Sequence, residues 1–121
     1  MTRALLIDTD PGIDDAVAIA LALGSPEVNV IGISTVGGNS GLAATTNNAL
    51  RLLEFFGRTD IPVASGYDEP YRRAKAETGY EPVHGQDGLA GVDLPAPTIK
   101  VVSTDAPAFL ADKIRNSPDP V

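Results

Sequence analysis

The chain has 121 residues, of which 43% are hydrophobic and 21% charged, and its formal net charge is −7. This length and composition fit one folded domain and exclude a disordered chain of low hydrophobicity. The acidic balance argues against binding of a nucleic-acid backbone, and the absence of cysteine excludes disulfides and thiolate metal sites. With no apparent signal peptide or membrane-spanning apolar run, we expect a cytoplasmic protein.

The first half of the chain alternates between strand and helix patterns. Continuous apolar runs predict buried strands at residues 4–7, 28–36 and 61–64. Residues 14–23 and 41–56 predict helices, the first apolar after two aspartates and the second with an apolar stripe at helical spacing. The β-α-β-α-β order predicts an α/β fold with an open, mostly parallel sheet of Rossmann-like type.

The second half of the chain is less regular. Residues 66–97 are rich in glycine, proline and acidic residues and follow no periodicity, which is typical of a functional loop or lid. Residues 104–116 predict a third helix, with an acid early and bases late. A further strand would be expected after Val121. We therefore expect residues 1–121 to form a single partial domain, the N-terminal portion of a larger fold.

Four aspartates fall within eight residues, where the first predicted strand ends: Asp8, Asp10, Asp14 and Asp15. Open α/β sheets bind their ligands beyond the carboxyl ends of their strands. Packed together without a cation, these carboxylates would repel one another and be driven to take up protons. A hard cation with oxygen ligands, Ca²⁺ or Mg²⁺, resolves that repulsion. The cluster therefore predicts a divalent cation site, in preference to solvated turn residues with a helix cap.

The spacing of the four acids predicts that they do not all act alike. Asp14 and Asp15 are adjacent at a helix start, so their side chains point about 100° apart, and one can face a cation while the other faces a substrate hydroxyl. Asp8 and Asp10 alternate at the strand end. An EF-hand is excluded, because isoleucine stands where that loop needs its glycine and its bidentate glutamate.

Four motifs occur in the order in which a known family carries them. They are Asp8-Thr9-Asp10-Pro11-Gly12-Ile13-Asp14-Asp15-Ala16, Ser34-Thr35-Val36-Gly37-Gly38-Asn39, Thr46-Asn47-Asn48-Ala49 and Val83-His84-Gly85-Gln86-Asp87-Gly88-Leu89. The first is highly specific, and the others gain their weight from the order. Together they resemble the inosine-uridine preferring nucleoside hydrolase family over essentially the whole chain.

That resemblance implies hydrolysis of the N-glycosidic bond of ribonucleosides to ribose and a free base, in purine and pyrimidine salvage. It implies Ca²⁺ as the cofactor, with Asp10 and Asp15 as ligands and Asp10 also accepting a proton from the metal-bound water. Asp8 would support the cation. The chemistry is consistent, because carboxylates stabilise an oxocarbenium-like sugar and a cation lowers the pKa of its water.

The resemblance also assigns residues to the substrate. Asp14 would hold a ribose hydroxyl, and Asn39 would contact the substrate as well. His84 would lie in the pocket, although a single histidine is more often a structural hydrogen-bonding residue. The expected partner is a small ribonucleoside, not nucleic acid or a membrane. Because oligomers are usual in the family, the resemblance also allows a homo-oligomer.

Family members are considerably longer and take further cation and ribose ligands from their second half. Because Ca²⁺ takes about six to eight oxygens, we expect this chain alone to be inactive or weakly active. One alternative is a Mg²⁺-dependent phosphatase of the haloacid dehalogenase class with Asp8 as nucleophile and Asp10 as acid/base, although Pro11-Gly12 stands where that class has Gly-Thr. The other is a non-enzymatic cation-binding fragment that needs a partner chain.

Overall fold

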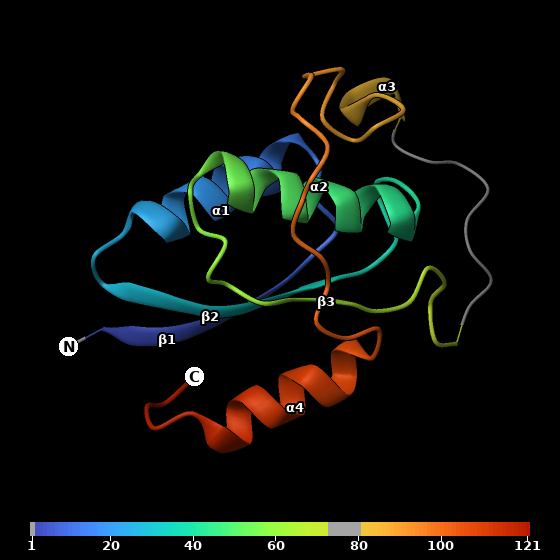
Figure 1. Ribbon diagram of the computed structural model, residues 1–121. Helices are drawn as coiled ribbons and strands as arrows, with labels where there is room; N and C mark the ends of the chain where they lie inside the picture. Colours follow the sequence, from blue (N-terminus) through green and yellow to red (C-terminus); the bar gives the residue numbers. More distant parts are fainter. Residues whose placement is uncertain (1, 73–80) are drawn as a thin grey trace.

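The computed structural model describes residues 2–72 and 81–121, which form an α/β fold (Figure 1). Three parallel strands lie side by side in the order β1 (Arg3–Thr9), β2 (Val28–Thr35) and β3 (Val63–Ser65). The predicted fold class is confirmed, as are the first two strands. The third strand begins two residues later than expected.

Helices cover both faces of the sheet. The crossover helices α1 (Ile13–Gly24) and α2 (Leu42–Phe55) lie on one face, and α4 (Ala106–Asn116) lies on the other (Figure 1). The carboxylate of Asp105 accepts a hydrogen bond from the N–H of Ala108 at 3.1 Å. This cap makes α4 begin two residues later than predicted.

In the described part of the stretch predicted to be irregular, residues 66–97, the chain forms one helical turn, α3 (Glu81–His84). Part of that prediction, residues 73–80, lies outside the described residues. The turn of α3 lies above the end of the sheet where β1 leads into α1 (Figure 1). It therefore brings His84 to the same end of the molecule as the acidic cluster.

A short sheet segment beside β3 was not indicated by the sequence pattern. The N–H of Val102 donates to the carbonyl of Val63 at 2.8 Å, and the N–H of Ser65 donates to the carbonyl of Ser103 at 3.0 Å. Ala64 and Ser103 form an isolated parallel bridge. The pairing is too short to produce a strand periodicity in the sequence. The sheet therefore gains a neighbour to β3 before α4, in a segment for which the sequence predicted no element.

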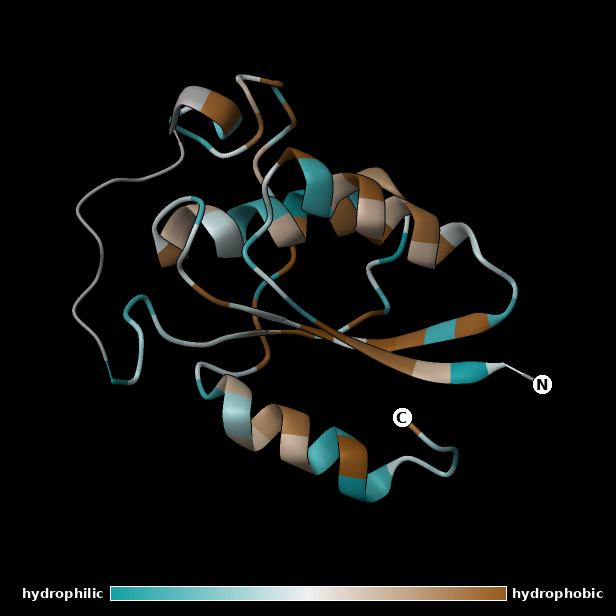
Figure 2. Ribbon diagram, turned by 180° about the vertical axis from the view of Figure 1, so that it is seen from behind, coloured by the Kyte–Doolittle hydropathy of each residue, from teal (hydrophilic) through white to brown (hydrophobic). Residues whose placement is uncertain are grey.

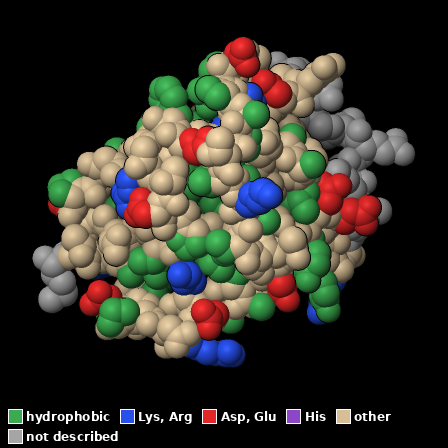
Figure 3. All heavy atoms as spheres, in the orientation of Figure 1, with side chains coloured by type: hydrophobic (Ala, Val, Ile, Leu, Met, Phe, Trp, Pro, Cys, Tyr) green, Lys and Arg blue, Asp and Glu red, His purple; other side chains and the backbone are tan. Residues whose placement is uncertain are grey.

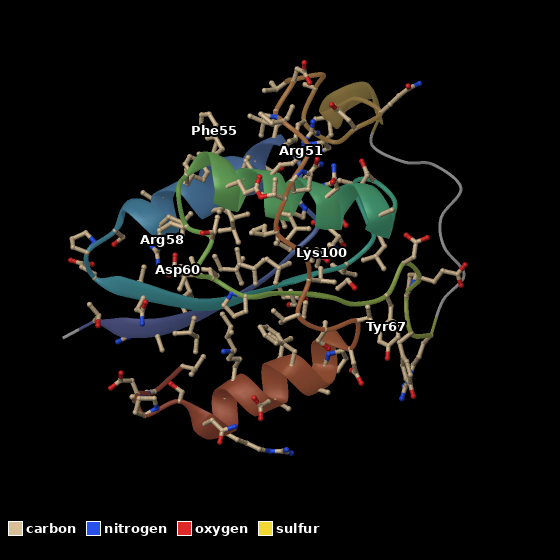
Figure 4. All side chains as sticks on the ribbon, viewed as in Figure 1. Arg51, Phe55, Arg58, Asp60, Tyr67 and Lys100 are labelled. Carbon is tan, nitrogen blue, oxygen red and sulfur yellow. The ribbon has the colours of Figure 1, made fainter. Side chains whose placement is uncertain are left out.

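The chain reaches that position by crossing over α2. Arg51 donates from Nε to the carbonyl of Pro95 at 3.1 Å, and Figure 4 shows its side chain beside this segment. Glu54, one turn further along α2, accepts hydrogen bonds from both the N–H and the hydroxyl of Thr98, each at 2.6 Å. These contacts fix an otherwise irregular segment to a helix of the core.

An apolar core fills the space between the sheet and the two crossover helices. Leu53 of α2 and Ile33 of β2 are fully buried within it. Figure 2 shows hydrophobic residues along both the strands and the helices. On the opposite face, Gly32 leaves room for α4, because a Cβ there would lie 2.7 Å from the ring of Phe109. Burial on both faces is what a parallel sheet requires.

In the view of Figure 3, acidic, basic and hydrophobic side chains are interspersed over the surface. Among the described residues, no helix combines the length and the apolar character needed to cross a membrane.

Candidate functional site

The acidic cluster lies at the carboxyl end of the sheet, where β1 and β2 run into the loops that follow them. The parallel register pairs Asp8 with Ser34 and Thr9 with Thr35. The hydroxyl of Ser34 donates to Oδ1 of Asp8 at 2.6 Å. Asp8 is thereby tied to the neighbouring strand, at the edge of the cluster.

Asp15 accepts hydrogen bonds from three parts of this region. Its Oδ1 accepts from the hydroxyl of Thr9 at 2.9 Å, and its Oδ2 accepts from the N–H of Gly12 at 3.1 Å and from Nδ2 of Asn39 at 3.4 Å. The N–H groups and dipole of a helix start favour negative charge there. Asp15 therefore holds together the loop at 10–15, called the acidic loop below, and links it to the loop after β2.

Asp10 is held by Asn39 through two contacts. The N–H of Asn39 donates to Oδ2 of Asp10 at 2.8 Å, and Nδ2 of Asn39 donates to the carbonyl of Asp10 at 3.1 Å. Gly38 allows this approach, because a Cβ there would lie 2.3 Å from Oδ2 of Asp10. The structure thus brings together Asp10, Asp15 and Asn39.

Asp14 has different surroundings from its neighbour Asp15. Its side chain is 81% exposed, and its Oδ1 lies 4.0 Å from Nδ1 of His84. Asp15 points instead into the acidic loop. The two adjacent side chains therefore point in different directions, as expected at a helix start, with Asp15 inside the acidic loop and Asp14 exposed to solvent.

His84 packs directly against the start of α1. It is buried, and its Nδ1 accepts a hydrogen bond from the N–H of Ile13 at 3.2 Å. A Cβ on Gly12 would lie 2.5 Å from the same nitrogen, so only glycine fits beneath the ring. Because Nδ1 accepts, the proton of the neutral ring is on Nε2. His84 is therefore a fixed hydrogen-bonding residue beside Asp14.

Asn48 contributes to this region although the sequence pattern gave it no function. It lies on α2 and is 1% exposed, whereas a polar helix residue is more often solvated. Its Nδ2 donates to the carbonyls of Pro11 and Asp87, at 3.3 Å and 2.6 Å. In the sequence, only its place in the motif Thr46-Asn47-Asn48-Ala49 could have indicated a function for Asn48. That motif does not distinguish Asn48 from Asn47.

The loop at 85–91 folds tightly around Asp87. Oδ1 of Asp87 accepts hydrogen bonds from the N–H groups of Leu89 and Gly91, at 3.0 Å and 3.1 Å. Gly88 has a φ of 82°, a conformation that favours glycine. The bond from Gly91, followed by that from Leu89, holds the pKa of the Asp87 carboxyl below its usual range.

This loop is expected to loosen in acid. Because the pKa of Asp87 is lowered by folding, its contribution is fully present above about pH 4, the ordinary aspartate pKa, and is lost as pH falls through the lowered value. The amide shifts of Leu89 and Gly91, followed by NMR from pH 6 to pH 2, should report the change. Asp87→Asn should abolish this titration; an unchanged titration in that variant would contradict the assignment.

The carboxylate oxygens of the site are of the chemical type that binds a hard cation. Asp10 and Asp15 share Asn39 as a hydrogen-bonding partner, and carboxylate oxygens are the ligands that Ca²⁺ prefers. The hydroxyl of Ser40, next to Asn39 in the chain, is buried without a partner among the described residues. The described residues contain no cluster of three or more acidic or histidine side chains able to hold a metal. Asp10 and Asp15 therefore fit only a part of the ligand shell of a cation.

Known proteins of the same kind match nearly the whole chain. The family model for inosine-uridine preferring nucleoside hydrolase matches residues 5–121. The probable uridine nucleosidase 2 of Arabidopsis thaliana is 46% identical over 116 residues, which are 96% of this chain and 36% of that protein. The pyrimidine-specific ribonucleoside hydrolase RihA of Shewanella sp. (strain MR-4) is 44% identical over 121 residues, 100% of this chain and 37% of that protein.

A solved structure agrees with the sequence matches. The plant nucleoside hydrolase PpNRh1 superimposes with a TM-score of 0.90 at 44% identity, over 98% of this chain and 37% of that one. The chain thus spans little more than a third of the length of these relatives. The resemblance carried by the four motifs is confirmed, and the chain belongs to the inosine-uridine preferring nucleoside hydrolase family.

Proposed function

We propose that this chain supplies the acidic part of a site that hydrolyses the N-glycosidic bond of ribonucleosides, releasing ribose and a free base. The observation that carries the proposal is the meeting of Asp10, Asp15 and Asn39 at the carboxyl ends of β1 and β2, in a chain of this family. Ligands of open α/β sheets bind at that end. Family membership also favours this reaction over the phosphatase alternative.

The residues divide the work on the substrate. Asp10 acts as the general base that accepts a proton from the attacking water. Asp14, exposed beside His84, holds a ribose hydroxyl. Asn39 fixes Asp10 through its N–H and contacts the substrate. As the bond to the base breaks, positive charge develops on the sugar, and the nearby carboxylates stabilise it.

Asp10 and Asp15 would hold the Ca²⁺ that the family resemblance implies, with Asp8 in support. When bound, the cation supplies the positive charge that brings the pKa of a water molecule toward neutrality. The hydrogen bonds that Asn39 makes to both acids support this assignment, because they keep the two carboxylates on one side of the acidic loop.

The names and lengths of the relatives support a substrate and an expectation about the isolated chain. Two of them are named for uridine or pyrimidine ribonucleosides, so we include uridine among the substrates. Because the chain spans about 36% of their length, we expect it to turn over nucleosides weakly or not at all alone. The remaining ligands would come from other segments or from a partner chain. A homo-oligomer and a cytoplasmic location remain part of the proposal.

A chimera with a longer relative tests this function. The segment of the Shewanella enzyme that aligns with this chain is replaced by the chain itself, to which it is 44% identical over 121 residues. We expect the chimera to release ribose from uridine or inosine in the presence of Ca²⁺. The isolated chain should be at least about 10²-fold slower, since one missing transition-state contact can cost that much.

Three results would separate the alternatives. A folded chimera that releases no ribose would contradict the proposed function. Robust turnover by the isolated chain would contradict the need for further residues. Release of phosphate from an aryl phosphate with Mg²⁺, tested on the same preparations, would favour the phosphatase alternative with Asp8 as the nucleophile.

A further inference from the structure

We propose that Asn48 is a positioning residue that clamps the loop at 85–91 onto the acidic loop at 10–15 and thereby fixes His84 over the site. The link between the loops rests on contacts alone. Its consequence for catalysis rests on the proposed function.

The side-chain amide of Asn48 is matched to two backbone carbonyls from distant parts of the chain. Its Nδ2 donates to Pro11 in the acidic loop at 3.3 Å and to Asp87 in the second loop at 2.6 Å. Pro11 and Asn48 are both almost fully buried. An amide nitrogen has two hydrogens, so one side chain can serve both acceptors. Both loops are thereby attached to the same point of α2.

A second attachment lies on the other side of Gly12 and is made by His84, the last residue of α3, directly before the loop at 85–91. Asn48 holds the carbonyl of Pro11, and His84 accepts from the N–H of Ile13 at 3.2 Å. The second loop is itself closed, because the N–H of Ala90 donates to the carbonyl of His84 at 2.6 Å. Two hydrogen bonds therefore hold this part of the chain against the acidic loop, in addition to the burial of Leu89. When the Asn48 donor is removed, only the bond to His84 remains, and we expect His84 to move more readily relative to Asp14.

The packing at Gly88 shows how closely this clamp is fitted. A Cβ on Gly88 would lie 3.0 Å from Nδ2 of Asn48, 3.1 Å from the hydroxyl of Ser40 and 3.2 Å from the carbonyl of Pro11. The φ of Gly88, 82°, also disfavours any side chain there. The loop therefore rests on the clamp through backbone atoms, without an intervening side chain.

The neighbouring Asn47 provides a matched control. It is the same residue type, one position earlier on α2, but it is only half-buried. It lines a separate cavity of about 510 Å³ together with Thr46 and Leu50. Asn→Asp at either position changes one nitrogen to oxygen and adds the same charge. At Asn48 alone, the change removes the donor and places a carboxylate against two carbonyls.

The single histidine of the sequence makes the test specific. In ¹⁵N NMR of the 121-residue chain at pH 8, we expect His84 to show the fixed Nε2–H tautomer. In Asn48→Asp we expect a mixture of tautomers, and hydrogen exchange at the Ile13 N–H about tenfold faster, the size of one net hydrogen bond. Asn47→Asp should match the unmodified chain. A merely structural role would lower the melting temperature without selectively changing the His84 ring.

A folded Asn48→Asp variant that keeps the fixed tautomer would overturn the proposal. If that variant does not fold, Gly88→Ala tests the same contact from the loop side. It should release His84 in the same way, and an unchanged ring would overturn the clamp. In the chimera, Asn48→Asp should lower kcat about 10²-fold, the cost of a misplaced site. An inactive parent chimera would contradict the proposed function, while the His84 spectrum would still decide the clamp.

Discussion

Replacement of Asp10 with asparagine is expected to lower uridine hydrolysis by the chimera about 10²–10⁴-fold, which is the contribution of a positioned general base. Asparagine keeps an oxygen that can accept the N–H of Asn39, now at 2.8 Å, so the loop should keep its shape. It cannot take up a proton at neutral pH, and it offers no negative charge to a cation. The rate of ribose release at saturating uridine measures the effect.

The control for this change is Asp105→Asn, which alters an acid on the opposite face of the sheet. Asp105 caps α4 by accepting from the N–H of Ala108, and asparagine caps helices equally well. Its rate should stay at the parent value. If Asp10→Asn proves as active as this control, Asp10 is not the base.

The position of Asp10 can also be disturbed without changing any acid. In Gly38→Ala, the new Cβ would lie 2.3 Å from Oδ2 of Asp10, so the carboxylate must shift. The rate of ribose release by this variant should therefore fall toward that of Asp10→Asn. Gly41→Ala is the matched change three residues later, where the nearest atom to the new Cβ is 3.9 Å away. If both variants released ribose at the same rate, catalysis would not require the Asp10 carboxylate to lie where the structure places it.

Elements with long, regular patterns could be predicted from the sequence. The eight-residue β2 (Val28–Thr35) and the fourteen-residue α2 (Leu42–Phe55) were predicted because their apolar periodicity is set locally. The pairing of Val102 and Ser103 with β3 was missed. That pairing depends on backbone bonds to residues about forty positions earlier, and such bonds leave no trace in a short window of sequence.

The same distinction applies to the site. Asp8, Asp10, Asp14 and Asp15 are close in sequence, so their grouping needed no knowledge of the fold. Asn39 was assigned to the substrate only through the family resemblance, and its contact with Asp10 was not predicted, because the two residues lie 29 positions apart. The role of Asn48 could not be predicted, because its two carbonyl partners lie 37 and 39 residues away. Its burial is decided by loops that carry no periodicity of their own.

The largest effect on stability is expected at Leu53, which is fully buried between α2 and the sheet. Leu53→Ala should lower the free energy of unfolding by about 2–5 kcal/mol, because it removes buried methyl groups and leaves a cavity. That is a large share of the roughly 5–15 kcal/mol that stabilises a domain. Denaturation in urea, followed by circular dichroism, measures the change.

Leu21→Ala is the matched control, because it is the same substitution on α1 at a position that is 74% exposed. Its effect should stay within about 0.5 kcal/mol. Equal losses in the two variants would mean that α1 and α2 do not differ in burial as described. A loss confined to Leu53 would show that the packing of α2 against the sheet contributes stability that an exposed position on α1 does not.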